Sequence, residues 1–190
     1  MTFKSALLGA VGAVCLAGGA CAAEGNTAMM AYVKDQAAIL AADSVVMSAM
    51  RASNARHADL TEDQILALDA AWRAEVGAAV TPTISPVLDD PASEIVRGAV
   101  ANSQGRMTEV ILMDNRGMNV AISGVTSDFW QGDEAKFLET FGAGPEAVHT
   151  GEVEFDESTQ AYQVQVSVPV ADETGALVGA VAVGLNIDAF

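Results

Sequence analysis

An acidic side chain and a large aromatic one stand two positions apart in the segment 126–134. Asp128 can pair with a ligand ammonium group, and the ring face of Trp130 can hold the same cation. Both belong to the stretch 123–134, which begins at Ser123 and is expected to fold over a sheet face. An equally weighted interpretation makes Trp130 a plug of the core and Asp128 a turn residue that binds backbone N–H groups. The residue types alone favour neither.

Polar side chains alternate with valines along 161–170, where Gln163 and Gln165 point away from the valine face. The valine face, which includes Tyr162, is expected to be core, and the glutamine face to be wet or to line a pocket. We expect a ligand to bind between the glutamine face and the segment 123–134. Arg106 is one of nine basic residues, and a ligand carboxylate would suit it.

Signatures of catalysis and of metal binding are absent from the sequence. His57 and His149 are the only histidines, and neither stands in a triad or zinc motif. His57 is expected to cap the end of a helix, while His149 lies in a loop. Neighbouring acids lack the spacing of a calcium loop and are expected to be solvated turns and helix caps. We therefore expect no enzyme activity, no metal and no cofactor.

The composition excludes some partners. Nine Lys+Arg against 25 Asp+Glu give a net charge of −16, which argues against nucleic acid and against anionic membrane surfaces. Hydrophobic residues make up 51% of the chain and charged residues only 18%, so a packed core is expected rather than disorder.

The first 23 residues are typical of a secretory signal peptide. Lys4 precedes the uncharged run 6–20, and small residues follow it up to Ala22 and Ala23. Cleavage there removes both cysteines, Cys15 and Cys21. Two alternatives are an uncleaved membrane anchor and lipidation of Cys21, although Gly18 occupies the lipobox position that a branched aliphatic residue usually holds. The prediction is a periplasmic or secreted domain of residues 24–190.

Helices are expected in the first half of the mature chain. Small and apolar residues recur at steps of three and four from 26 to 58, which predicts one continuous helix over 27–56. Thr61 and Gln64 fit a capping box, so a second helix is expected to follow Thr61. Three prolines in 81–91 indicate an extended connector, and a further helix is expected over 92–102.

The second half predicts an antiparallel sheet. Apolar runs at 107–113, 118–123, 152–155, 161–170 and 177–187 are typical of about five strands, and a short helix is expected over 132–140. The last run is apolar on both faces and is expected to be the central strand. The order of helices first and strands afterwards predicts an α+β fold.

Two strand–turn–strand units carry a family resemblance. They are D-N-R-G-M-N-V-A at 114–121 and V-A-D-E-T-G-A-L-V-G-A at 170–180, with T-S-D-F-W-Q-G-D-E between them. Together with a long N-terminal helix, they resemble the extracytoplasmic PAS-like sensor modules called Cache or PDC domains. The resemblance covers about residues 30–190. It implies a small-molecule pocket on one face of a twisted sheet, read out through the long helix, and a membrane receptor or kinase as signalling partner.

The leading hypothesis is therefore a non-catalytic periplasmic sensor-type domain that binds a small polar metabolite, such as an amine, an amino acid or a carboxylate. A protein without a ligand, which forms a homodimer through its N-terminal helix, is the alternative from another class. An exported hydrolase ranks third.

Overall fold

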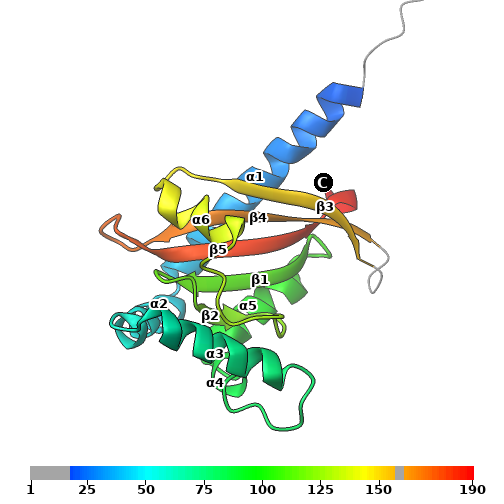
Figure 1. Cartoon of the computed structure of the whole chain (residues 1–190). Coiled ribbons are helices and arrows are strands. Elements are labelled where there is room, and N and C mark those ends of the chain that lie inside the picture. Colours follow the sequence, from blue (N-terminus) through cyan, green and yellow to red (C-terminus); the bar gives the residue numbers. More distant parts are fainter. Residues whose placement is uncertain (1–17, 157–160) are drawn as a thin grey trace, which may run out of the picture.

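The sheet has five antiparallel strands in the order β2-β1-β5-β4-β3, preceded by helices, as the α+β prediction requires. The computed structural model describes residues 18–156 and 161–190 (Figure 1). The strands are β1 (Met107–Asp114), β2 (Asn119–Ile122), β3 (His149–Asp156), β4 (Ala161–Ala171) and β5 (Leu177–Asn186). The expectation of a central last strand is confirmed, because β5 pairs with β1 on one side and β4 on the other.

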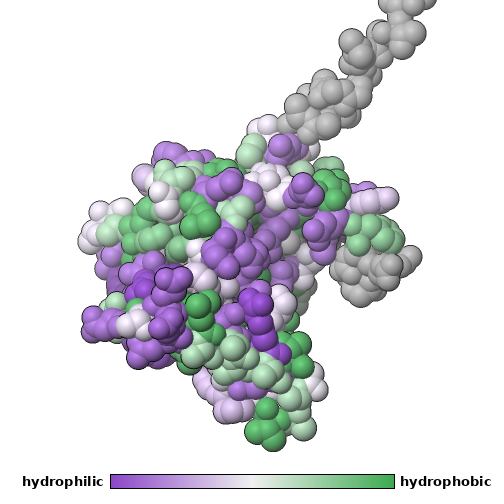
Figure 2. Space-filling view, in the orientation of Figure 1, coloured by the Kyte–Doolittle hydropathy of each residue, from purple (hydrophilic) through white to green (hydrophobic). Residues whose placement is uncertain are grey.

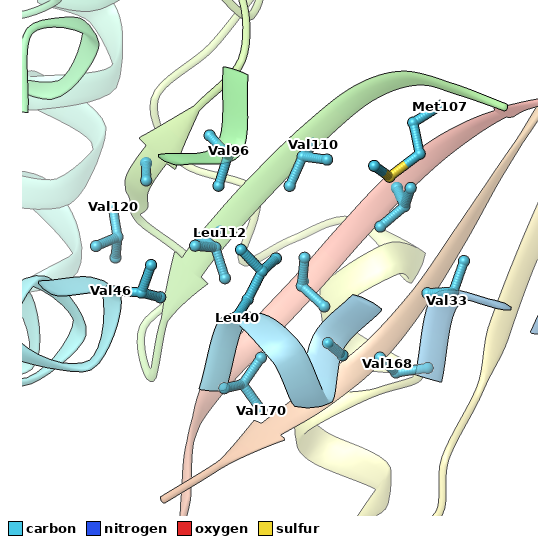
Figure 3. Packing of buried hydrophobic residues seen from close by; sticks show 14 of the residues in the cluster. Val33, Leu40, Val46, Val96, Met107, Val110, Leu112, Val120, Val168 and Val170 are labelled. Atoms are coloured by element: carbon cyan, nitrogen blue, oxygen red, sulfur yellow. The ribbon is translucent and has the colours of Figure 1, made fainter. Parts of the chain in front are cut away.

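Alternating side chains divide the core between the two faces of the sheet. On β1, Val110 and Leu112 belong to one buried cluster, whereas Ile111 and Met113 belong to a second. The first face is covered by α1 (Gly18–Ala42), α2 (Ser44–His57) and α5 (Pro91–Asn102). Figure 3 shows the valines of β4 facing Val33 and Leu40 of α1.

The second face carries α3 (Glu62–Glu75), α4 (Ser85–Leu88), the segment 123–134, α6 (Ala135–Leu138) and the 3-10 turn η1 (Phe141–Ala143). A 3-10 turn, η2 (Ile187–Ala189), follows β5. Figure 1 shows α1 passing behind the sheet and projecting beyond it, while α6 lies in front. Near α6 the second face is covered less completely than the first, because α6 is a single helical turn.

The prediction of one continuous helix over 27–56 is wrong. The chain breaks at Asp43, whose backbone is extended at φ −80° and ψ 122°. Its carboxylate accepts hydrogen bonds from the N–H groups of Val45 and Val46, at 2.8 and 3.3 Å, and so begins α2. The helical periodicity runs through this point because both helices pack on the same face of the sheet.

The capping box at Thr61 is confirmed. Thr61 Oγ1 accepts from Gln64 N, and Gln64 Oε1 accepts from Thr61 N at 2.9 Å. The connector 81–91 is not wholly extended, because Ser85–Leu88 forms the short helix α4. Proline occupies the first turn of α4, where no N–H donor is needed.

Tyr162 differs from its expected place in the core, since 54% of it is exposed. It lies at the start of β4, beyond the part of the strand that α1 covers.

Among residues 18–156 and 161–190, no helix is long and apolar enough to cross a membrane. Residues 1–17, which hold most of the predicted signal peptide, lie outside the described residues.

Candidate functional site

A hollow of about 320 Å³ lies on the second face, at one end of the sheet. Gly184 opens it, because this glycine is the residue of β5 that lines the hollow. A Cβ at Gly184 would lie 2.5 Å from Thr108 Oγ1, so no side chain fits there. The hollow is lined by Thr108, Glu109, Glu134, Lys136, Gly151, Glu152, Glu154, Gln163, Val164, Gln165 and Gly184.

Acidic side chains dominate the lining, with four glutamates against the single cation Lys136. The Glu109 carboxyl is the most enclosed of them. Burial raises its pKa above the ordinary glutamate value, while the Lys136 ammonium and a hydrogen bond with Gln165 lower it in part. Lys136 Nζ lies 3.1 Å from Glu134 Oε2, and its side chain is only 16% exposed. The hollow therefore offers an enclosed carboxyl at Glu109, two exposed glutamates at its β3 side and a single cation to balance them.

Two of the site residues predicted from the sequence, Gln163 and Gln165, line this hollow. Glu134, at the end of the segment 123–134, lines it as well. The structure thus brings the glutamine face of β4 together with the end of that segment, but not with its centre. Figure 2 shows hydrophilic residues gathered over the sheet on the face that carries α6, and hydrophobic ones towards α3.

Asp128 and Trp130 do not line the hollow. They hold the segment 123–134 to α3 and to the β1–β2 turn. Asp128 Oδ1 accepts from Gln131 Nε2 at 2.6 Å, and Oδ2 lies 3.7 Å from Arg73 Nη2. Trp130 donates from its ring N–H to the Arg116 carbonyl at 2.8 Å and packs against the second core cluster. These contacts are those of a structural plug and turn, which was the second of the two interpretations drawn from the sequence.

Asp69 of α3 fastens the same segment. Its Oδ1 accepts from the N–H groups of Phe129 and Trp130, at 2.9 and 3.1 Å, while its Oδ2 pairs with Arg73 at 2.7 Å. Trp72 then stacks on Phe129 with ring centroids 5.0 Å apart.

Ser123 and Arg106 are likewise apart from the hollow. Ser123 Oγ accepts from the N–H of Val110 at 2.9 Å and so fastens the residue after β2 to the middle of β1. The Arg106 guanidinium lies over the rings of Tyr32 and Phe190, 5.6 and 5.7 Å from their centroids. Burial raises the pKa of Tyr32, while the Arg106 charge lowers it in part.

Glu109 and Lys136 both line the hollow, but the sequence pattern does not predict that they lie near each other. Glu109 follows Met107 in β1, where a bulge between these two residues shifts the register against β5. A glutamate directly before the apolar run 110–113 was the available signal. Nothing in the local pattern relates it to Lys136.

A buried Ser, His and Asp meet between α2 and the β1–β2 turn. His57 Nδ1 lies 2.6 Å from Asp114 Oδ2, and Ser53 Oγ donates to the same oxygen at 2.9 Å. In a catalytic triad, the serine and the aspartate bind opposite nitrogens of the ring. Here Ser53 and Asp114 both face Nδ1, and all three side chains are buried. The cluster is therefore a structural junction rather than a nucleophile.

No cluster of three or more His, Cys, Asp or Glu in residues 18–156 and 161–190 is arranged to hold a metal ion.

No family model matches the chain, and no curated protein matches it by sequence. Solved structures that match it include the ligand-binding domain of the Campylobacter jejuni chemoreceptor Tlp3, in complex with L-norvaline, at 12% identity and a TM-score of 0.39. That match covers 86% of this chain and 56% of that chain. The ligand-binding domain of the Pseudomonas aeruginosa amino acid chemoreceptor PctC, in complex with GABA, matches at 15% identity and a TM-score of 0.35, over 83% of this chain and 61% of that one.

The sensor domain of E. coli DcuS matches at 16% identity and a TM-score of 0.36, over 67% of this chain and 89% of that one. The chain thus spans little more than half the length of the chemoreceptor domains it matches. The matched proteins are Cache or PDC-type sensor domains, the class that the two D-x-x-G units resemble. At this level of identity the likeness concerns the general fold, and each bound ligand is a property of the protein named.

Proposed function

We propose that this chain is a non-catalytic, sensor-type domain of the periplasm, which binds a small polar metabolite carrying an ammonium group. The ligand lies in the hollow on the second face, between β1, β3, β4, β5 and α6. A separate membrane receptor or kinase reads out its binding.

The acidic lining of the hollow carries this proposal. An ammonium group placed beside Glu109 restores the charged form of a carboxyl that burial disfavours. Gln163 and Gln165 of β4 also line the hollow and offer amide donors and acceptors, and Gln165 is hydrogen-bonded to Glu109. Lys136 can receive a carboxylate if the ligand has one, which would place an amino acid across the hollow.

The size of the hollow agrees with this class of ligand. About 320 Å³ is at the lower end of the range for small-molecule sites, which suits a metabolite with few heavy atoms. The mixture of one cation and four anions in the lining disfavours a ligand that carries only carboxylates.

A thermal-shift screen of amines, amino acids and carboxylates tests the proposal. A ligand that binds the native state but not the unfolded state raises the free energy of unfolding by about 2.7 kcal/mol at a concentration of 100 times Kd. We expect a hit among the amines or amino acids, and Glu109→Gln is expected to weaken that hit tenfold or more, since a charged hydrogen bond is typically worth about 1.5–3 kcal/mol.

Glu94→Gln is the matched control, because Glu94 is an exposed glutamate of α5, away from the hollow. Gly151→Val is a second variant, which fills the hollow from its β3 side. A Cβ at Gly151 lies 3.4 Å from Gln165 O, an ordinary contact. If Glu109→Gln and Gly151→Val both bind the hit as the wild type does, the ligand binds elsewhere.

A further inference from the structure

The two edges of the sheet differ in how they are protected. The segment 129–131 covers the start of β2, because Asn119 N donates to Phe129 O at 3.0 Å and Gln131 N donates to Gly117 O at 2.8 Å, and Ile122 N at the end of β2 donates to Ser93 Oγ at 2.9 Å. The other edge, β3, makes no backbone hydrogen bond on its outer side within the described part of the chain. Unpaired N–H and C=O groups on an edge strand are a template for another strand.

Side chains on β3 are exposed on both faces of the strand. Val153 is 59% exposed and Phe155 48% exposed, and Phe155 meets Tyr162 edge-on with ring centroids 5.2 Å apart. Glu152 and Glu154 alternate with them and are exposed on the other face, beside the hollow. Lysine and proline, which commonly blunt edge strands, are absent from the eight residues of β3. The pairing of β3 with β4 is irregular between Thr150 and Val153, so the regular part of the exposed edge is 153–156, and the charge that it carries is negative.

Charge decides what can pair with this edge. Glu109 and Glu134 add to the negative charge on the side of Glu152 and Glu154, and the whole chain has a net charge of −16. In a symmetric antiparallel pair of two β3 strands, residues of the same face meet, so Glu152 or Glu154 would stand opposite a glutamate of the other copy. Like charges directly opposite destabilise a strand pair, which argues against a second copy.

We propose that the outer edge of β3 binds an extended, basic segment of a partner protein. In this segment, lysines or arginines alternate with apolar residues. The segment adds a sixth strand to the sheet. Its cations pair with Glu152 and Glu154 on one face, while its apolar residues pack on Val153, Phe155 and Tyr162 on the other. Main-chain hydrogen bonds supply affinity, and the alternation supplies specificity.

A labelled eight-residue peptide of alternating lysine and valine is the probe, measured by fluorescence anisotropy and by amide hydrogen exchange of the whole chain. We expect saturable binding that slows exchange in residues 150–156. Glu152→Lys combined with Glu154→Lys is expected to weaken binding tenfold or more. The control is Asp35→Lys combined with Asp59→Lys, which makes the same charge change at exposed acids outside the hollow and the β3 edge.

A second control is the same peptide with proline in place of a central valine, which keeps the charge but interrupts the ladder. Equal binding of both peptides, or an equal loss in the two double variants, would overturn the proposal in favour of general charge attraction. Protection of 150–156 that depends on protein concentration, without any peptide, would overturn it in favour of a second copy.

Discussion

At the scale of single residues, the same turn chemistry serves two different environments. Asp114 and Asp172 each begin a D-x-x-G turn, with Gly117 and Gly175 at positive φ. Asp172 is solvated at its turn, and hydrogen bonds from Thr174 lower the pKa of its carboxyl. Asp114 is fully buried and serves α2 as well as its own turn.

Replacement of Asp114 is therefore expected to cost far more than replacement of Asp172. Asp114 Oδ1 accepts from Arg116 N and Met118 N, and Oδ2 accepts from Ser53 and faces His57. Asp114→Ala leaves several buried donors without an acceptor and is expected to lose about 3 kcal/mol or more of unfolding free energy in urea. Asp172→Ala, the control, is expected to lose clearly less. Equal losses would mean that the buried junction contributes little.

Glu109 gives a pH-dependent prediction. Because its folded pKa is raised, the folded state binds its proton more tightly than the unfolded state does. Stability is therefore lost as the pH rises from the ordinary glutamate value of about 4.3 through the higher folded value. Glu109→Gln is expected to raise Tm at neutral pH and to match the wild type below about pH 4. A Tm difference that does not change with pH would contradict this origin.

At the scale of elements, the break between α1 and α2 has a direct test. Ser44 is the first residue of α2, after the extended backbone of Asp43, and proline is well tolerated at such a position. Ser44→Pro is expected to change the unfolding free energy by less than about 1 kcal/mol, whereas Ser48→Pro, in the exposed interior of α2, is expected to cost about 3 kcal/mol. A similar cost at both positions would favour a continuous helix.

The sequence predicts the elements whose signals are local. The capping box at Thr61, the alternation along β4 and the D-x-x-G turns are each contained in a few neighbouring residues, and each is confirmed. The break at Asp43 was missed because aspartate inside an apolar periodicity is compatible with an exposed helix position. Only its extended backbone turns it into a cap.

The candidate site depends on contacts between distant residues, which local patterns do not contain. The sequence left Asp128 open between a ligand contact and a turn residue, because its pairing with Arg73 of α3 joins residues 55 positions apart. The hollow itself brings Glu109 of β1 to Lys136 of α6 across the sheet. Gln163 and Gln165 could be predicted because the period of two along a strand fixes their face.

At the scale of the whole molecule, the long N-terminal helix contributes unevenly to the fold. Among the α1 side chains that the structure describes, from residue 25 onward, Met29 is the first in the buried cluster of the first face, followed by Val33, Ala37 and Leu40. Figure 1 shows the N-terminal part of α1 projecting beyond the sheet. The described core contacts of α1 therefore begin after the proposed cleavage site.

Removal of residues 1–23 is accordingly expected to leave Tm unchanged, because every described core residue is retained. Removal of residues 1–36 deletes Met29 and Val33, which are 8% and 0% exposed, and is expected to cost at least about 3 kcal/mol of burial. Thermal unfolding of the full chain and both shortened chains checks this. Export is tested separately: the intact mass of the periplasmic form is expected to correspond to a start at Ala23 or Glu24. A stable chain without residues 1–36 would show that α1 does not hold the first face together, and a periplasmic mass that includes Lys4 would overturn the proposed cleavage.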